Sequence, residues 1–251
     1  MFEREERDGI ATLRLAHGKA SAFDLELLLG LEAALSDELQ RSSRAVILTG
    51  TGSIFSAGVD LFRLLDGGSD YIDLFVPALD RVFSQLFAYP KPMVAAINGH
   101  AIAGGCILAA CADRRIMAAG KGRIGVPELL VGVPFPKVAF EIMRFALPSR
   151  SLSQVIYKGI TVRPEAALEI GLIDLVVSPD DLLETAHEEA RELAEIPAIS
   201  FQLSKKMTRG PTRNSFDSTE AERNEIVDAW KSEPVRAALS RYVERTFGRS
   251  S

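Results

Sequence analysis

One stretch organises the chain: Pro92-Met-Val-Ala-Ala-Ile-Asn-Gly-His-Ala-Ile-Ala-Gly-Gly-Cys106. Its apolar residues 92–97 predict a buried strand, and the small residues that continue to Asp113 predict a helix. A glycine pair at a strand-to-helix junction lets the backbone approach a ligand closely, and it leaves the first N–H groups of the helix unpaired. The junction therefore predicts a site for an anion.

The composition is typical of a soluble globular protein. The 251 residues are 47% hydrophobic and 25% charged, which is enough for one sizeable core. The net charge of −5 argues against a general nucleic-acid binder, and no apolar run approaches the roughly 18 residues that span a membrane. Cys106 and Cys111 lie in apolar sequence, as buried thiols do, and the three histidines lack ligand-type spacing, so no metal is expected. Because residues 1–7 are too charged for a signal or transit peptide, we expect a cytoplasmic protein.

Strands and helices alternate along most of the chain. Residues 2–15 predict a hairpin around Asp8-Gly9, and Asp24 predicts the N-cap of a helix that runs to about Gln40. Further strands are expected at 44–49, 92–97, 114–118 and 172–177, and further helices from 59 onward and at 71–88, 137–146, 151–157, 164–170, 180–195, 198–208, 215–231 and 234–247. The pattern predicts an α/β core, residues 1–196, and a helical C-terminal module, residues 197–251.

Three familiar motifs are absent. Gly50-Thr-Gly52 begins like a dinucleotide-binding loop, but Phe55 stands where the third glycine belongs. The lysine-containing phosphate loop of nucleotide-hydrolysing enzymes does not occur. A nucleophile elbow needs glycine two residues before the serine. Ile54 occupies that position before Ser56, so a serine nucleophile is not supported.

Two similar loops remain, and each follows a buried strand and opens a helix. They are Phe55-Ser-Ala-Gly-Val-Asp60 and Ala101-Ile-Ala-Gly-Gly-Cys106. With their flanks, Ile54 to Leu61 and Pro90 to Cys106, they resemble the two signatures of the crotonase superfamily, the enoyl-CoA hydratases and isomerases. Either signature alone is weak, but the two together in this order are specific.

The resemblance covers nearly the whole chain, because it continues through Gly125-Val-Pro-Glu128 and residues 167–174 into the helical tail. It implies a crotonase-like ββα spiral core that holds an acyl-CoA site. It also implies a homotrimer or a dimer of trimers, with residues 197–251 as the oligomerisation module. An acyl-CoA thioester is the expected partner, with no nucleic acid, no membrane and no cofactor other than the coenzyme A of the substrate.

By the same resemblance, the backbone N–H groups of Val59 and Gly104 form an oxyanion hole for the thioester carbonyl. Removing the proton next to a thioester puts negative charge on the carbonyl oxygen. Positioned N–H donors stabilise that enolate, and each is worth about 3 kcal/mol where it has been measured. A helix that begins at Gly104 adds its positive dipole end.

The acid–base residues separate two reactions. Hydratases of the family use one glutamate three residues after the oxyanion glycine and a second in the later Pro-Glu; here Ile107 and Glu128 occupy these positions. Adding water is work that two carboxylates usually share. Moving a double bond from the 3,4 to the 2,3 position needs one base, and a glutamate with a pKa raised by desolvation suits it. The chain most resembles the single-glutamate Δ3,Δ2-enoyl-CoA isomerases.

Two alternatives stay open. One is an enoyl-CoA hydratase or related acyl-CoA lyase that uses Glu128 with an unidentified partner, for which His100 is a candidate. The other is a non-catalytic acyl-CoA binding protein, because Ile107 removes half of the usual acid–base pair. Glu141, on the helix predicted at 137–146, is expected to face solvent.

Coenzyme A is polyanionic, so an acidic protein needs local cations to bind it. Lys19-Ala-Ser-Ala-Phe-Asp24 resembles the family's CoA loop, but the usual Arg-Asn-Ala-Leu-Asn is altered, which leaves Lys19 as the candidate cation. Lys205 and Lys206 are further candidates, and Phe62, Leu65 and Leu130 are candidate pocket walls. The expected CoA and acyl contacts are Lys19, Ala20, Ala22, Ala57, Asp60, Leu61, Gly105 and Phe135.

Overall fold

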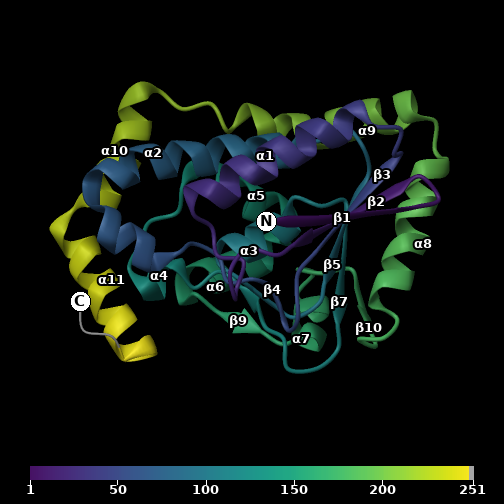
Figure 1. The fold of residues 1–251 in the computed structure, drawn as a ribbon. Helices are drawn as coiled ribbons and strands as arrows, with labels where there is room; N and C mark the ends of the chain where they lie inside the picture. Colours follow the sequence, from purple (N-terminus) through teal and green to yellow (C-terminus); the bar gives the residue numbers. More distant parts are fainter. Residues whose placement is uncertain (249–251) are drawn as a thin grey trace.

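The computed structural model describes residues 1–248 (Figure 1). It begins with the predicted hairpin, in which β1 (Phe2–Arg7) pairs antiparallel with β2 (Ile10–Leu15). Asp8 and Gly9 have φ of 55° and 74°, as a two-residue hairpin turn with two left-handed residues requires. The hairpin prediction is confirmed, and β2 leads the chain into the main sheet.

The main sheet has the strand order β1-β2-β3-β5-β7-β10, and from β2 onward neighbouring strands run parallel. The added strands are β3 (Ala45–Thr49), β5 (Met93–Ile97), β7 (Arg114–Ala118) and β10 (Leu175–Val177). Every residue of β3 and β5 is buried, because helices cover both faces. One face packs on α8 (Leu182–Glu195), and the other faces the larger core beneath α1 (Leu25–Gln40).

A second, smaller sheet lies beside the first, and the sequence indicates only one of its strands, β8 (Ile124–Gly125), as a short extended piece at residues 123–126. Its order is β4-β6-β8-β9, with β4 (Ile54–Ser56), β6 (His100–Ile102) and β9 (Thr161–Val162). Strand β4 runs parallel to β6. Their carboxyl ends therefore lie at one edge of the sheet, and the two glycine loops that follow them meet there.

The helices that surround this edge follow the sequence closely. Asp24 caps α1 by accepting from the Leu27 N–H, and Asp60 caps α2 (Leu61–Phe87). The two helices expected from residue 59 onward are both present within α2, which is interrupted at Gly68, where φ is 62° and ψ is −154°. The short α3 (Gly104–Ala110) begins directly after the second glycine loop. The remaining core helices are α4 (Glu128–Val131), α5 (Lys137–Ala146), α6 (Ser149–Lys158) and α7 (Pro164–Glu169).

The C-terminal module consists of α9 (Ala198–Asn214), α10 (Glu220–Lys231) and α11 (Glu233–Phe247). Figure 1 shows α10 and α11 at one end of the molecule, against α2, while α9 runs along the top of the view and also contacts α5. None of the helices in residues 1–248 is both long and apolar enough to cross a membrane.

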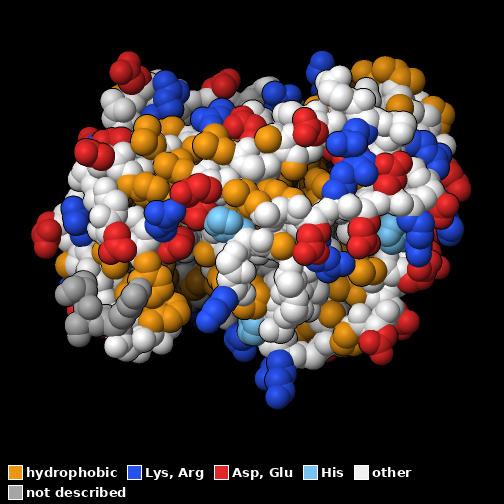
Figure 2. Space-filling view, viewed as in Figure 1, with side chains coloured by type: hydrophobic (Ala, Val, Ile, Leu, Met, Phe, Trp, Pro, Cys, Tyr) orange, Lys and Arg blue, Asp and Glu red, His pale blue; other side chains and the backbone are white. Residues whose placement is uncertain are grey.

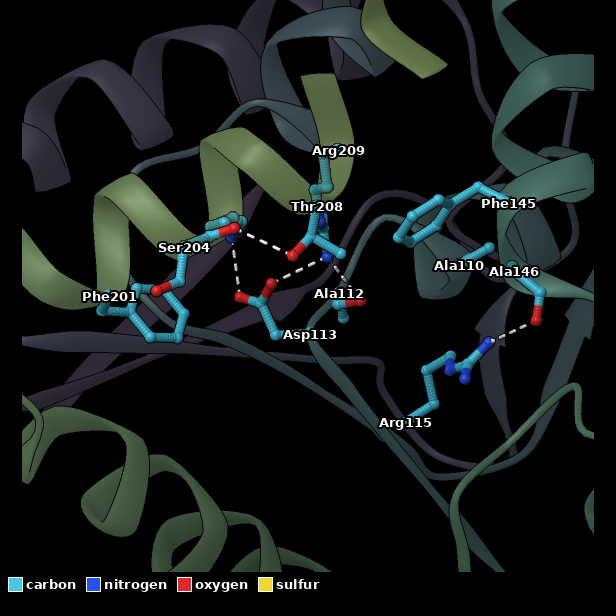
Figure 3. A pocket seen from close by; sticks show the side chains of 11 residues that line it. Ala110, Ala112, Asp113, Arg115, Phe145, Ala146, Phe201, Ser204, Thr208 and Arg209 are labelled. Atoms are coloured by element: carbon cyan, nitrogen blue, oxygen red, sulfur yellow. Dashed lines mark hydrogen bonds and ion pairs between the residues drawn. The ribbon is translucent and has the colours of Figure 1, made fainter. Parts of the chain in front are cut away.

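A buried ionic cluster fastens α9 to the core (Figure 3). Arg209 donates to the carbonyl oxygens of Cys111 and Ala112 at the end of α3, and it pairs with Asp113 at 2.7 Å. Lys205 pairs with the other oxygen of Asp113, also at 2.7 Å, and is only 8% exposed. The expectation that Lys205 contacts a CoA phosphate is therefore wrong, because its ammonium group is buried in an ion pair.

Candidate active site

The two glycine loops pack backbone against backbone. Gly58 has a φ of 81°, and a Cβ there would lie 2.5 Å from the Ile102 carbonyl oxygen and 3.0 Å from the Gly104 nitrogen. Ala103, which precedes α3, has a φ of 52° and a ψ of −123°, a conformation that costs a residue with a side chain about 1–3 kcal/mol. Only glycine at position 58 allows this approach, and it brings the amides of Val59 and Gly104 close together.

These two amides are free to bind a ligand. Within residues 1–248, neither the Val59 N–H nor the Gly104 N–H donates to a protein acceptor, whereas the neighbouring Asp60 and Cys106 N–H groups each donate at 2.9 Å. Val59 and Gly104 both line one cavity. Two unpaired amides that face one space can stabilise negative charge on an oxygen placed between them.

The cavity has a volume of about 560 Å³, within the range of small-molecule sites. Figure 2 shows hydrophobic side chains lining a hollow beside the C-terminal helices. Apart from the loop residues already described, the wall includes His17, Lys19, Ile54, Leu61, Phe62, Leu79, Phe83, His100, Ile107, Glu128, Val131, Val133, Ala139, Trp230, Tyr242 and Phe247. The wall is mostly apolar.

Glu128 is the first residue of α4 and points an unpaired carboxyl into these surroundings. It is 7% exposed, and its Oε2 has no hydrogen-bond partner in residues 1–248. Burial raises the pKa of Glu128 from 4.5 to about 8, against a smaller lowering by its own backbone N–H. A buried carboxyl that has one oxygen without a partner and a pKa near neutrality is suited to take up and release a proton.

The other acidic and apolar neighbours of the cavity support this role for Glu128. Asp60 also lines the wall, but its Oδ1 accepts from the Phe62 and Arg63 N–H groups as the cap of α2. Ile107 lies on α3 in the same wall and is buried. The position that carries the second glutamate in hydratases is thus an apolar part of the cavity surface.

Most of the expected contact residues lie in the wall. Lys19, Ala20, Ala22 and Ala57 line the cavity together with Asp60 and Leu61, and Lys19 is exposed at its edge. His17 is nearby, 2.7 Å from Asp24.

Several expected residues lie elsewhere. Gly105 is not part of the wall, because it packs on β4, where a Cβ would lie 2.3 Å from the Ser56 carbonyl oxygen. Phe135 packs beside Phe140, with ring centroids 6.4 Å apart, outside the wall. Leu65 and Leu130 also lie outside it, and Leu130 is exposed. Glu141 is buried beside Arg144, so the expectation that it faces solvent is wrong.

The C-terminal helices supply wall residues that the sequence did not predict. Trp230 belongs to α10, and Tyr242 and Phe247 belong to α11. The amphipathic pattern of these helices indicates a buried face, but it does not show which cavity that face covers.

Comparisons with known proteins agree with this geometry. The family model for enoyl-CoA hydratase/isomerase matches residues 5–248. Mitochondrial enoyl-CoA delta isomerase 1 of Mus musculus is 29% identical over 249 residues, 98% of this chain and 86% of its own. A putative enoyl-CoA hydratase of Thermus thermophilus is 34% identical over 186 residues, 72% of this chain and 73% of its own.

The crystal structure of human mitochondrial delta3-delta2-enoyl-CoA isomerase superposes with a TM-score of 0.93 at 26% identity, and the match covers 97% of each chain. The crotonase-like fold expected from the two signatures is confirmed. This chain is an enzyme that belongs to the enoyl-CoA hydratase/isomerase family.

Proposed function

We propose that the protein is a Δ3,Δ2-enoyl-CoA isomerase. The observation that carries this proposal is the buried carboxyl of Glu128, whose Oε2 has no partner in residues 1–248, in a wall where Ile107 stands in place of a second glutamate. One base suffices for a double-bond shift, whereas hydration is usually shared between two carboxylates.

In the proposed reaction, the thioester carbonyl oxygen accepts hydrogen bonds from the Val59 and Gly104 N–H groups. The Glu128 carboxylate removes a proton from C2, and the electron pair of the broken C–H bond moves onto the carbonyl oxygen as an enolate. The same glutamate then delivers its proton to C4. The double bond forms between C2 and C3, the enolate collapses, and no atom is gained or lost.

The apolar wall supports both steps. It raises the pKa of Glu128 to about 8, so the protonated form that serves C4 is readily formed at neutral pH. At about pH 7 roughly one tenth of the unliganded enzyme carries the carboxylate that begins the reaction. Ile107 places an apolar side chain in the wall at the position where hydratases of the family carry their second glutamate.

The direct test compares wild type and Glu128→Gln with a 3-enoyl-CoA and a 2-enoyl-CoA substrate. We expect wild type to isomerise the 3-enoyl ester, and Glu128→Gln to lose about 10²–10⁴-fold in kcat while still binding. Water addition by wild type at a rate matching isomerisation would refute the isomerase assignment. Isomerisation that survives Glu128→Gln would refute the site, and binding without turnover of either ester would favour the binding-protein alternative.

We also propose that copies of the chain assemble through the C-terminal module, as the family resemblance implies. Ile199, Leu203 and Met207 are exposed apolar residues spaced four apart on α9, so they form one stripe. Such a stripe is typical of a surface that another molecule covers. Sedimentation should give a trimer or hexamer for wild type and smaller species for Leu203→Glu, whereas an unchanged distribution would place the interface elsewhere.

A further inference from the structure

We infer that Trp230 forms the closed end of the acyl pocket and limits the length of the acyl chain that the site accepts. The inference rests on the proposed function only in taking the ligand to be an acyl-CoA thioester. It concerns the far side of the cavity from the coenzyme, which neither the glycine loops nor Glu128 defines.

The cavity wall changes from exposed to buried along its length. Lys19 and Ala57 are exposed, and Phe247 is 57% exposed. In contrast, Phe83 is fully buried and Trp230, which also belongs to the wall, is only 2% exposed. The phosphates of coenzyme A must stay near water, because burying unpaired charge is costly. The acyl chain therefore extends past the oxyanion amides toward the buried aromatic side chains.

Trp230 is held rigidly at this buried side. Its Nε1–H donates to the Pro134 carbonyl oxygen at 3.0 Å, and the neighbouring Lys231 pairs with Asp73 of α2 at 2.8 Å. The next helix packs closely, since a Cβ at Gly132 would lie 2.5 Å from the Ala238 Cβ. An indole fixed at both its own nitrogen and its helix forms a wall and not a movable flap.

The apolar character of this wall determines which terminal groups of an acyl chain the pocket can bind. Because the only polar atom of the indole is already bonded to Pro134, the ring presents no free donor to the ligand. Phe83 and Leu79 line the same cavity, and their side chains are apolar and buried as well. The pocket therefore suits an acyl chain that ends in a methyl group, and it disfavours a chain with a terminal hydroxyl or carboxylate.

The affinity for an acyl-CoA ester should increase with acyl chain length until the chain reaches the Trp230 indole, and it should fall for longer chains. Each methylene that enters the apolar pocket should tighten binding about four-fold. A chain longer than the pocket would have to displace a close-packed tryptophan, so the gain should reverse.

The test uses Trp230 itself, because it is the chain's one tryptophan. Wild-type emission is followed during titration with coenzyme A and with saturated acyl-CoA esters of rising length, which cannot isomerise. We expect no change with saturating coenzyme A or the shortest esters, and a shift once the chain reaches the indole. An emission that stays the same for every saturating ester, or that changes equally with coenzyme A alone, would overturn the inference.

Two variants provide an independent readout through the affinity for each ester. Trp230→Phe shortens the wall, so the tightest-binding chain should become longer by one or more carbons. Phe247→Ala is the matched control at the exposed side, and it should change all affinities by a similar factor. A uniform effect of Trp230→Phe would refute the inference. If saturated esters bind as expected while 3-enoyl esters are not isomerised, only the proposed function fails; if no ester binds, both fail.

Discussion

Replacing Glu128 by glutamine should stabilise the folded protein at alkaline pH while it removes activity. The perturbation deletes one titrating group and keeps the size of the side chain. Burial raises the pKa of Glu128 from 4.5 to about 8 in the folded state, so between these values the folded chain holds a proton that the unfolded chain has released. The contribution of Glu128 to the wild-type free energy of unfolding is therefore fully present below pH 4.5, and it is lost as the pH rises to about 8.

The magnitude follows from the width of that interval. Each pH unit within it costs about 1.4 kcal/mol, so the wild type should lose about 3 kcal/mol from this group between about pH 5.5 and about pH 8.5. Glutamine does not titrate. The free energy of unfolding of Glu128→Gln, taken relative to wild type, should therefore rise by the same amount, or by roughly 6–12 °C in Tm for a chain of this length.

The assay is urea unfolding of both proteins at several pH values, followed by the emission of Trp230, which is buried in the folded state. Glu128→Leu is the control, because it changes the packing but also removes the titrating group. Both variants should share one pH dependence relative to wild type, whatever their absolute stabilities. Parallel stability curves for wild type and Glu128→Gln across this range would show that the carboxyl is not the buried proton-binding group described here.

Three further substitutions test other parts of the site. Ile107→Glu adds a second carboxyl to the wall that contains Glu128, and repulsion between the two should raise the pKa of Glu128. The rising limb of the pH–rate profile should therefore shift to higher pH, and water addition to a 2-enoyl ester should become measurable. Gly58→Ala should lower kcat at least about 10²-fold with little change in coenzyme A affinity, because its Cβ would lie 2.5 Å from a carbonyl oxygen of the facing loop. Arg209→Met leaves Asp113 with one cation and should cost about 3–5 kcal/mol in urea unfolding, while kcat per folded molecule changes little. Unchanged profiles, turnover or unfolding midpoints, respectively, would contradict these expectations.

The parts of the fold that the sequence predicted are those that local chemistry determines. Asp8-Gly9 forms its turn from two adjacent residues, and Asp24 caps α1 through an amide three residues away. The central strands β3 and β5 are buried on both faces and so appear as continuous apolar runs. The two glycine loops and Glu128, which line one cavity in the structure, could be selected from sequence because their motifs are short and contiguous.

The parts that were missed depend on distant contacts. Strands β4, β6 and β9 have only two or three residues each, and they form because the surrounding chain holds them together. Lys205 appears from sequence as a surface cation, yet Asp113, 92 residues away, makes its burial possible. Trp230 is in the cavity wall because α10 returns to the core, which helical periodicity alone does not predict.

Three energetically unfavourable features lie together at the cavity, and their combination distinguishes an enzyme that turns over its substrate from a protein that only binds it. Ala103 holds a backbone conformation that costs about 1–3 kcal/mol, and this conformation leads directly into Gly104. The amides of Val59 and Gly104 forgo protein hydrogen bonds, which a protein that only held a thioester would also need. The third cost is different in kind. A partnerless carboxyl against an apolar wall does nothing for a neutral thioester at rest, and Gln or Leu at position 128 would remove the penalty of ionising it there. That cost has a use only when a proton must leave carbon and return to it, and this favours the isomerase over the binding-protein alternative.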